Sequence, residues 1–424
     1  MELKRILILT ADTGFGHRSA AKAVRAALEE KYGDRCRVDI VNPLDDKRAP
    51  FFLRDSQSDY DRIVREVPQL YQLGYQASDN PLPVAIFESA LTLGMFEVLR
   101  ELLKQYRPDA ILNTYPMYQA PLRAVFSLEN HSIPMFTVIT DLVSVHKIWF
   151  HPQVDGLFVP TEEVRQLALD LGIAPEKVML TGIPVHPAIS REKRHPGQIR
   201  ASLGWETDLP TFLAIGSKRV EGLEGILNVF NHFGKPLQLA VVAGKDHNLY
   251  ESLLKMEWHV PVHIYEYSDQ VPALMRAADG VICKAGGLVV TEALASGRPM
   301  MLINIIPGQE TGNARFVVQG SAGDMAQDPM TALEVLSHWM MDDAHLLKLR
   351  SEIAQRLGKP EAAYLVADQV LKAAVQKPVR VTADTSLGKR LTAFFNESRV
   401  DLRRDARKVI PVHLRRSPKK NQRT

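Results

Sequence analysis

The sequence predicts an α/β protein built from two doubly wound domains, each with its own parallel sheet. The chain has 424 residues, enough for two domains of ordinary size with separate hydrophobic cores. Short apolar runs, suited to buried parallel strands, alternate with segments of helical apolar spacing, and this series starts twice. We expect an N-terminal domain at 1–187, a polar linker at 188–208, a C-terminal domain at 209–360, a candidate crossover helix at 361–376 and a basic, flexible tail at 377–424.

The first domain opens with a strand, a glycine loop and a helix. The apolar run at 4–10 leads into a loop with Gly14 and Gly16, and an alanine-rich helix follows. This order is typical of a doubly wound domain. A nicotinamide-dependent dehydrogenase begins similarly, but here the third small position of its glycine motif is Ser19, and the loop carries His17, which hydride transfer does not need there. The sequence therefore argues against dinucleotide binding by this loop.

Two further segments of the first domain stand out by composition. Leu82–Leu103 comes nearest to a membrane span, but charged residues interrupt it and predict a long amphipathic helix instead. Phe51–Tyr75 mixes aromatic side chains with arginines, which suits a membrane interface or a lipid-binding groove; a helix with an ordinary core face explains the pattern equally well. Further strands are expected at 38–41, within 107–116, and at 133–140, 156–159 and 178–181.

The centre of the second domain is a βαβ unit at 280–306. Its first strand is followed by a turn with Gly286 and Gly287, a helix that starts at Leu288, and a second strand. The glycines allow a sharp turn and leave the first helix amides free to hold an anionic group. One turn into the helix, Glu292 can accept hydrogen bonds from paired hydroxyls such as those of a ribose. An ordinary βαβ unit with a glycine turn is the alternative interpretation.

More polar residues follow the other strands of this domain. Gln309 and Glu310 stand on a turn just beyond the second strand of the βαβ unit, beside the predicted phosphate and ribose sites. Gly216 and Ser217 end the first strand of the domain and can donate to a diphosphate. Further strands are expected at 211–217, 237–243 and 262–265, and helices at 221–233, 329–341, 344–357 and 361–375.

The order of parts from Gly286 to Asn313 resembles a known signature. Gly-Gly-x-x-x-x-Glu-Ala-x-x-x-Gly-x-Pro, followed by Pro-Gly-Gln-Glu, is similar to the donor-nucleotide site of the glycosyltransferases that make monogalactosyl- and monoglucosyl-diacylglycerol. These are relatives of the peptidoglycan N-acetylglucosaminyltransferase. The Thr-Gly-x-Gly-His loop at 13–17, the Thr-Asp…His-Lys-x-Trp loop at 140–149 and Thr-Gly-Ile-Pro at 181–184 also resemble this family. The resemblance covers roughly 5–375 and implies the GT-B architecture, two Rossmann-like domains facing across a cleft.

The family resemblance suggests a role for each candidate residue. His17 is the first candidate for the base that deprotonates the acceptor, because its ordinary pKa lies near working pH. Asp141 is the alternative base, or the group that orients His17. Glu292 would bind the ribose, Gln309 and Glu310 the donor sugar, and Tyr267 would lie at the nucleobase pocket. Gly14, Gly16, His146 and Trp149 would belong to the acceptor side. Lys218 and Arg219 replace the glycines usual near Gly216 and Ser217, which weakens that assignment.

The implied reaction is inverting transfer of a hexose from UDP-glucose or UDP-galactose to diacylglycerol. Oriented amides at helix N-termini can stabilise the diphosphate leaving group, and no Asp-x-Asp motif in a suitable context is present, so we expect neither metal nor cofactor. A UDP-sugar epimerase of the same architecture and a catalytically idle lipid-binding protein are the alternatives.

Composition indicates where the protein works. Cys36 and Cys283 cannot form a disulfide framework, no apolar run reaches eighteen residues, and the chain starts directly with a strand, so we expect no signal peptide. The net charge is +3, but residues 377–424 carry +10 and the rest −7. Such a tail is attracted to anionic lipid. A solubilising tail remains open, whereas no nucleic-acid fold accompanies the charge. We expect a cytoplasmic protein peripherally associated with the cytoplasmic membrane.

Overall fold

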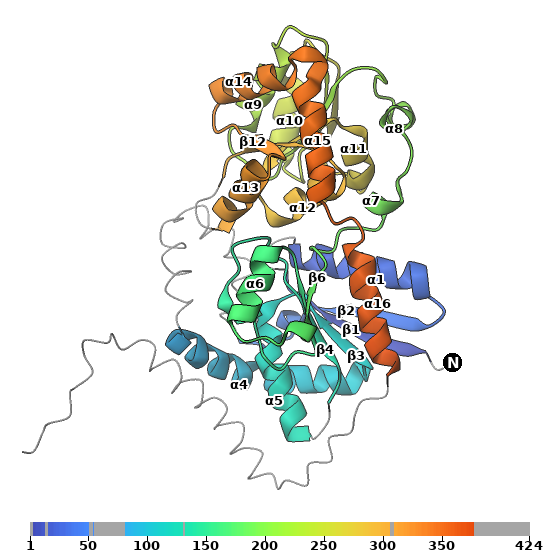
Figure 1. Cartoon of the computed structure of the whole chain (residues 1–424), viewed down its shortest axis with the longest axis vertical. Helices are drawn as coiled ribbons and strands as arrows, with labels where there is room; N and C mark the ends of the chain where they lie inside the picture. Colours follow the sequence, from blue (N-terminus) through green and yellow to red (C-terminus); the bar gives the residue numbers. More distant parts are fainter. Residues whose placement is uncertain are drawn as a thin grey trace, which may run out of the picture.

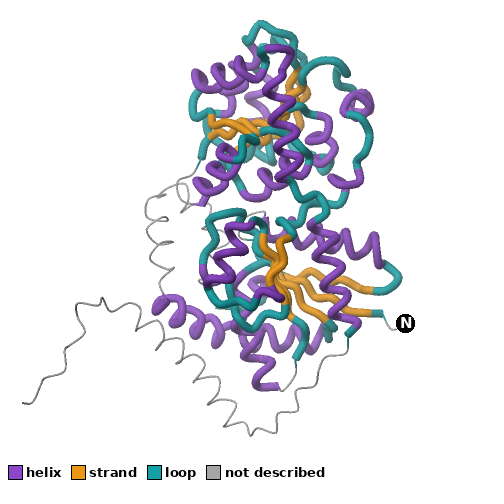
Figure 2. Tube along the Cα trace, viewed as in Figure 1, coloured by secondary structure: helices purple, strands orange, loops and turns teal. Residues whose placement is uncertain are grey.

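The protein has two α/β units, each built on its own parallel sheet. The computed structural model describes residues 3–12, 16–50, 54, 81–129, 132–305 and 309–376, with the backbone alone for 81–90 and Gln309. Each unit contains a six-stranded sheet with helices on both faces (Figure 1), and the two units stand one above the other along the long axis (Figure 2). The predicted α/β class is confirmed.

The first sheet has the order β2-β1-β3-β4-β5-β6, with all strands parallel. Its central strands β3, β4 and β5 are fully buried and mostly apolar because both faces of the sheet are covered. The strand order reverses between β1 and β3, and at such a switch point ligands bind outside the carboxyl ends of the strands. The strands are β1 Lys4–Leu9, β2 Cys36–Val41, β3 Ala110–Asn113, β4 Met135–Val138, β5 Gly156–Val159 and β6 Val178–Leu180.

The helices of the first unit form a layer on each face of this sheet. One face packs against α4, α5 and α6, and the other against α1 and α16. Thr161 caps α6, since its Oγ1 accepts a hydrogen bond from the Val164 amide at 3.3 Å. The helices are α1 Gly16–Tyr32, α4 Pro81–Tyr106, α5 Gln119–Glu129, α6 Glu162–Asp170 and α16 Ala362–Val375.

The second sheet has the order β12-β11-β10-β7-β8-β9 and is also parallel throughout. Its switch point lies between β7 and β10, next to the predicted glycine turn. The strands are β7 Thr211–Ile215, β8 Gln238–Val242, β9 Val262–Tyr265, β10 Gly280–Lys284, β11 Met300–Ile303 and β12 Gly323–Met325. The helices are α9 Leu223–Asn231, α10 His247–Lys255, α11 Val271–Ala277, α12 Gly287–Ala295, α13 Gln309–Gln319, α14 Pro329–Trp339 and α15 His345–Leu357.

The segment expected as a linker carries two short helices, α7 Ala188–Arg191 and α8 Pro196–Leu203. The buried Arg200 guanidinium on α8 donates to the Ala277 carbonyl at 2.8 Å and to Asp279 at 2.7 Å. These bonds hold the segment against the second unit. Short 3₁₀ helices elsewhere are Pro43–Asp45, Pro116–Tyr118, Lys147–Trp149, Pro175–Lys177 and Asp342–Ala344.

The two units are joined by an apolar interface and by two chain crossings. Ala20, Leu142 and Val143 of the first unit belong to the same buried cluster as Val290 and other residues of the second. After α15 the chain returns to the first unit, where α16 packs beside α1 (Figure 1). The loops that follow the strands at the two switch points are therefore held close together.

Candidate active site

His17 lies at the switch point of the first sheet, as the second residue of α1. Its Nδ1 is 2.7 Å from the Thr140 hydroxyl, which follows β4. The Tyr115 ring, just after β3, meets the imidazole edge to face at 5.0 Å between centroids, and the Trp149 ring lies at 5.9 Å. Two loops, the one after β3 with Tyr115 and the one after β4 with Thr140 and Trp149, thus enclose one imidazole.

These surroundings change the pKa of His17. Burial lowers its pKa from the ordinary 6.5 to about 4, and a hydrogen bond with the Thr114 backbone opposes the shift in part. The desolvated ring favours its neutral form because a charge is costly in apolar surroundings. At neutral pH the imidazole is therefore unprotonated and able to accept a proton.

Asp141 lies beside Trp149. Its Oδ2 accepts a hydrogen bond from the indole Nε1 at 2.7 Å, and Trp149 is fully buried. His146 begins the 3₁₀ helix that carries Trp149, because its Nδ1 accepts from the Ile148 amide at 3.2 Å. Asp141 and His146 thus fix the aromatic ring that packs near His17. Thr140, which contacts His17 directly, opens the predicted Thr-Asp motif, but the sequence assigns it no role.

The glycine turn of the second unit faces the same loop. Gly286 stands at the N-cap of α12 in an extended conformation, with no side-chain cap on the helix amides. A Cβ added to Gly287 would lie 3.4 Å from the Thr140 carbonyl oxygen. The start of α12 therefore abuts the residue that contacts His17, and its dipole favours negative charge at this point.

Glu292 lies one turn into α12, and Leu288 at its start is partly exposed. Burial raises the pKa of the Glu292 carboxyl from 4.5 to about 7. The carboxyl is therefore poised between its two forms near neutral pH. Partner hydroxyls that donate to it favour the ionised form.

Glu310, in the first turn of α13, forms an ion pair with a lysine that the sequence analysis did not single out. Lys284 Nζ lies 3.3 Å from Glu310 Oε1, and the two side chains are 10% and 13% exposed. Asn313 Nδ2 donates to the Ala285 carbonyl at 3.0 Å and ties α13 to the glycine turn. The side chain of Gln309 lies outside the described residues.

The remaining predicted residues occupy varied surroundings. A Cβ on Gly216 would lie 2.7 Å from Leu249 Cδ2 and 3.2 Å from the Val242 carbonyl oxygen, so a larger residue would have to displace its neighbours. Ser217 Oγ accepts from the Arg219 amide at 3.3 Å, within a local turn. Tyr267 is 53% exposed and carries Lys245 Nζ 4.3 Å above its ring. A Cβ on Gly16 would meet nothing within 4 Å. Gly14, Phe51–Tyr75 apart from Arg54, and the tail at 377–424 lie outside the described residues.

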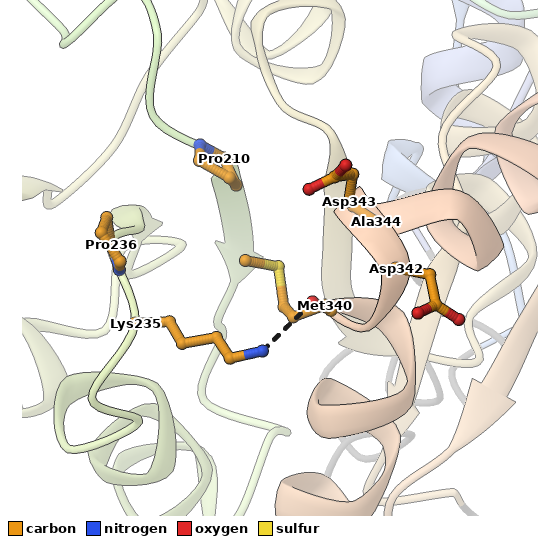
Figure 3. A pocket seen from close by; sticks show the side chains of 7 residues that line it. All are labelled: Pro210, Lys235, Pro236, Met340, Asp342, Asp343 and Ala344. Carbon is orange, nitrogen blue, oxygen red and sulfur yellow. Dashed lines mark hydrogen bonds between the residues drawn. The ribbon is translucent and has the colours of Figure 1, made fainter.

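A separate hollow lies at the opposite edge of the second sheet (Figure 3). Pro210 and Pro236 precede β7 and β8, so this hollow is at the amino ends of the strands, whereas the glycine turn follows a carboxyl end. Lys235 Nζ donates to the Met340 carbonyl at 3.4 Å across it. The hollow is lined by Pro210, Lys235, Pro236, Met340, Asp342, Asp343 and Ala344. We place no part of the candidate active site there.

Within the described ranges, no helix is long and apolar enough to cross a membrane. Cys36 and Cys283 are both buried free thiols. No group of three or more His, Cys, Asp or Glu side chains in the described part of the chain is arranged to hold a metal ion.

Sequence comparison identifies the family. The models of two families match the chain: monogalactosyldiacylglycerol (MGDG) synthase over residues 17–185, and the glycosyltransferase family 28 C-terminal domain over residues 217–363. The chain is 31% identical over 386 residues to the chloroplastic monogalactosyldiacylglycerol synthase of Spinacia oleracea, covering 88% of this chain and 73% of that protein. The chain belongs to the monogalactosyldiacylglycerol synthase family. The predicted family resemblance is confirmed.

Solved structures place this family member in the GT-B fold. MurG of Acinetobacter baumannii superposes with a TM-score of 0.55 at 16% identity, covering 87% of this chain and 99% of its own. A UDP-GlcNAc 2-epimerase of Neisseria meningitidis, bound to UDP-GlcNAc, gives 0.54 at 15% identity, covering 87% and 100%. At such identities the likeness shows the fold alone. Family membership makes this MGDG synthase relative a glycosyltransferase of glycolipid synthesis.

Proposed function

We propose that this protein transfers one hexosyl group from UDP-galactose or UDP-glucose to diacylglycerol, with inversion at the anomeric carbon. The observation that carries the proposal is the meeting at Thr140 of His17, from one switch point, and the glycine turn of α12, from the other. A base and an anion-binding helix start then lie next to the same residue, Thr140. The names of the curated relatives support diacylglycerol as the acceptor and galactose as the sugar.

His17 activates the acceptor. The neutral imidazole takes the proton of the diacylglycerol hydroxyl as its oxygen attacks the anomeric carbon. The bond from that carbon to the β-phosphate oxygen breaks on the opposite face, and UDP leaves with the bonding electrons. The resulting glycoside has inverted configuration, and His17 holds the proton until solvent removes it. Asp141 acts indirectly, by fixing Trp149 against the imidazole.

The start of α12 receives the charge that develops on the diphosphate. Its amides and dipole supply preorganised positive potential, so charge separation needs little reorganisation. Glu292 accepts hydrogen bonds from the ribose hydroxyls, and Gln309 and Glu310 bind the sugar hydroxyls. Glu310 and the glycine turn are joined through α13 and Asn313, which keeps the sugar and diphosphate sites in register.

The acceptor lies in a bilayer, so the enzyme works at a membrane surface. We propose peripheral association with an anionic cytoplasmic membrane, supported by the net charge of +10 on residues 377–424. Removal of these residues is expected to weaken binding to vesicles that contain anionic phospholipid, with little effect on neutral vesicles. Sedimentation of protein with the two kinds of vesicle measures this difference.

The test of the function is transfer of labelled sugar to lipid. UDP-galactose and UDP-glucose are offered separately to the protein with vesicles of diacylglycerol and anionic phospholipid, and chloroform-extractable label is counted. We expect labelled lipid from one donor, lost in both His17→Ala and Glu292→Ala.

A second candidate function is UDP-sugar epimerisation, because the fold is shared with a UDP-GlcNAc 2-epimerase. Interconversion of free UDP-sugar without labelled lipid in the same assay would favour the epimerase. The absence of both products would contradict the proposed function.

A further inference from the structure

We propose that Lys284 is a positioning residue for the donor sugar: its ammonium holds the Glu310 carboxylate where a sugar hydroxyl can donate to it. The inference rests on the proposed function, in which Glu310 binds the sugar. Lys284 ends strand β10, two residues before Gly286 of the glycine turn.

The ion pair joins two elements that meet at the reaction centre. Lys284 is the last residue of β10, beside the switch point of the second sheet, and Glu310 lies in the first turn of α13. The two charged atoms are 3.3 Å apart, and only about a tenth of either side chain is exposed. A pair so well shielded from water has a defined geometry, whereas the long side chains of exposed ion pairs adopt several conformations.

Stability alone does not explain a buried ion pair at this place. Replacing such a pair by apolar side chains is often neutral or stabilising, because both charges lose their hydration on burial. Burial indeed lowers the pKa of Lys284, and the Glu310 carboxylate opposes the shift. A carboxylate has about four acceptor sites, so it can accept from more than one donor at a time. The pair therefore suits a site where a carboxylate must be held in one orientation.

The surroundings of the pair connect it to the donor site. Arg219 and Glu221, from the loop after β7, also act electrostatically on Lys284, the first disfavouring and the second favouring its charge. Asn313, one turn beyond Glu310, donates to the Ala285 carbonyl, so α13 is fixed to the residue that follows Lys284. A displacement of the Glu310 carboxylate would thus change the sugar site while the amides of α12 stay in place.

The experiment compares Lys284→Met with wild type in the full chain. Steady-state transfer from the UDP-hexose that wild type uses gives kcat and KM, and calorimetry gives the Kd for UDP. We expect Lys284→Met to lose about 10²-fold in kcat/KM, as for a misplaced substrate group, while the Kd for UDP changes by less than about threefold, within the effect of an indirect perturbation. Lys284→Arg, which keeps the charge, should lose less. Lys255→Met removes a lysine from the exposed pair with Glu251 and should leave both quantities unchanged.

A further measurement separates positioning from mere stability. The double variant Lys284→Met/Glu310→Gln removes both charges, so its Tm should recover toward wild type while transfer stays low.

Several outcomes would overturn the inference. Wild-type kcat/KM in Lys284→Met would show that Glu310 needs no positioning. A parallel loss of UDP affinity and kcat/KM would mean that Lys284 contacts the diphosphate itself. If wild type transfers no hexose at all, the proposed function fails. The role of Lys284 is then judged by binding: the affinity for UDP-hexose divided by the affinity for UDP must be lower in Lys284→Met than in wild type.

Discussion

The two switch points of this molecule share a scaffold but hold different kinds of side chain. At the first, His17 is enclosed by Tyr115 and Trp149, and the surroundings are aromatic. At the second, an uncapped helix start lies beside the buried pair of Lys284 and Glu310. In the proposed function, the same strand, turn and helix thus serve proton removal in one domain and recognition of an anionic donor in the other.

Burial shifts the pKa values of the two titratable groups in opposite directions. It lowers the pKa of His17 to about 4 and raises that of Glu292 to about 7. In each case the neutral form is favoured because the charged form loses hydration. The histidine is therefore unprotonated across the neutral range, whereas the carboxyl changes form within it.

The largest expected effect is that of His17→Ala on turnover. Loss of a general base typically costs 10²–10⁴-fold in rate, so kcat should fall within about this range. Since the pKa of His17 is about 4, its protonation should limit wild-type kcat/KM only on the far acid side, below about pH 5. A pH–rate profile of wild type and variant measures both effects. Wild-type turnover in His17→Ala would assign the base elsewhere.

The next effect is the pH dependence of UDP binding through Glu292. If ribose hydroxyls donate to the ionised carboxyl, wild-type affinity for UDP should rise up to about tenfold between pH 6 and pH 8, as the carboxyl ionises around pH 7. Glu292→Gln keeps the shape of the side chain but removes the titrating carboxyl. The UDP affinity of this variant should therefore keep only the pH dependence that comes from UDP and other groups. If calorimetry gives the same pH dependence of UDP affinity for wild type and Glu292→Gln, this assignment is wrong.

The same carboxyl should influence stability with a defined sign. Its folded pKa is above the ordinary 4.5, so the folded state binds more protons and is penalised as pH rises from 4.5 through 7. Glu292→Gln should therefore gain stability over wild type at pH 8, by up to about 3 kcal/mol, and little at pH 4. Urea unfolding at the two pH values gives the difference. An equal difference in stability at the two pH values would show that folding does not change the pKa of this carboxyl.

A smaller effect is expected for Asp141→Asn. The amide oxygen can still accept from Trp149 Nε1, so the ring near His17 keeps its place. We expect a loss of kcat at least about tenfold smaller than that of His17→Ala, within the range of an indirect perturbation. A loss as large as that of His17→Ala would make Asp141 the base, or an equal partner in it.

The smallest effect is expected at the rim between the domains. Arg315 on α13 and Glu163 on α6 form an ion pair at 3.1 Å, but the side chains are 53% and 63% exposed. Exposed pairs contribute little because water and salt screen them. Arg315→Ala should change transfer by less than about threefold at physiological salt. A larger loss would show that the domains are held together by charge as well as by the apolar interface.

Local features of the fold were predictable because their causes are local. The cap at Thr161 and the strand at 156–159 follow from capping chemistry and apolar runs. The strand expected at 133–140 is shorter, Met135–Val138, because Thr140 already turns toward His17. The short helices of 188–208 escaped prediction because their stability comes from the buried Arg200 and not from apolar periodicity.

The site was predictable only in its parts. The glycine turn and Glu292 lie within one short stretch, so their order carries a signal. The contact of His17 with Thr140 joins residues 123 positions apart, and no spacing rule describes it. Lys284 lies at the end of an apolar strand, where its partner on α13 is invisible without the fold.

The most direct test of the separate roles of the two domains is the binding of UDP to inactive variants. Calorimetric titration of UDP into His17→Ala and Glu292→Ala is compared with wild type. We expect that His17→Ala binds UDP with an unchanged Kd although its kcat falls by about 10²–10⁴-fold, whereas Glu292→Ala binds at least about tenfold more weakly, as for a lost buried hydrogen-bonding group. Loss of UDP affinity in His17→Ala, with normal affinity in Glu292→Ala, would contradict it.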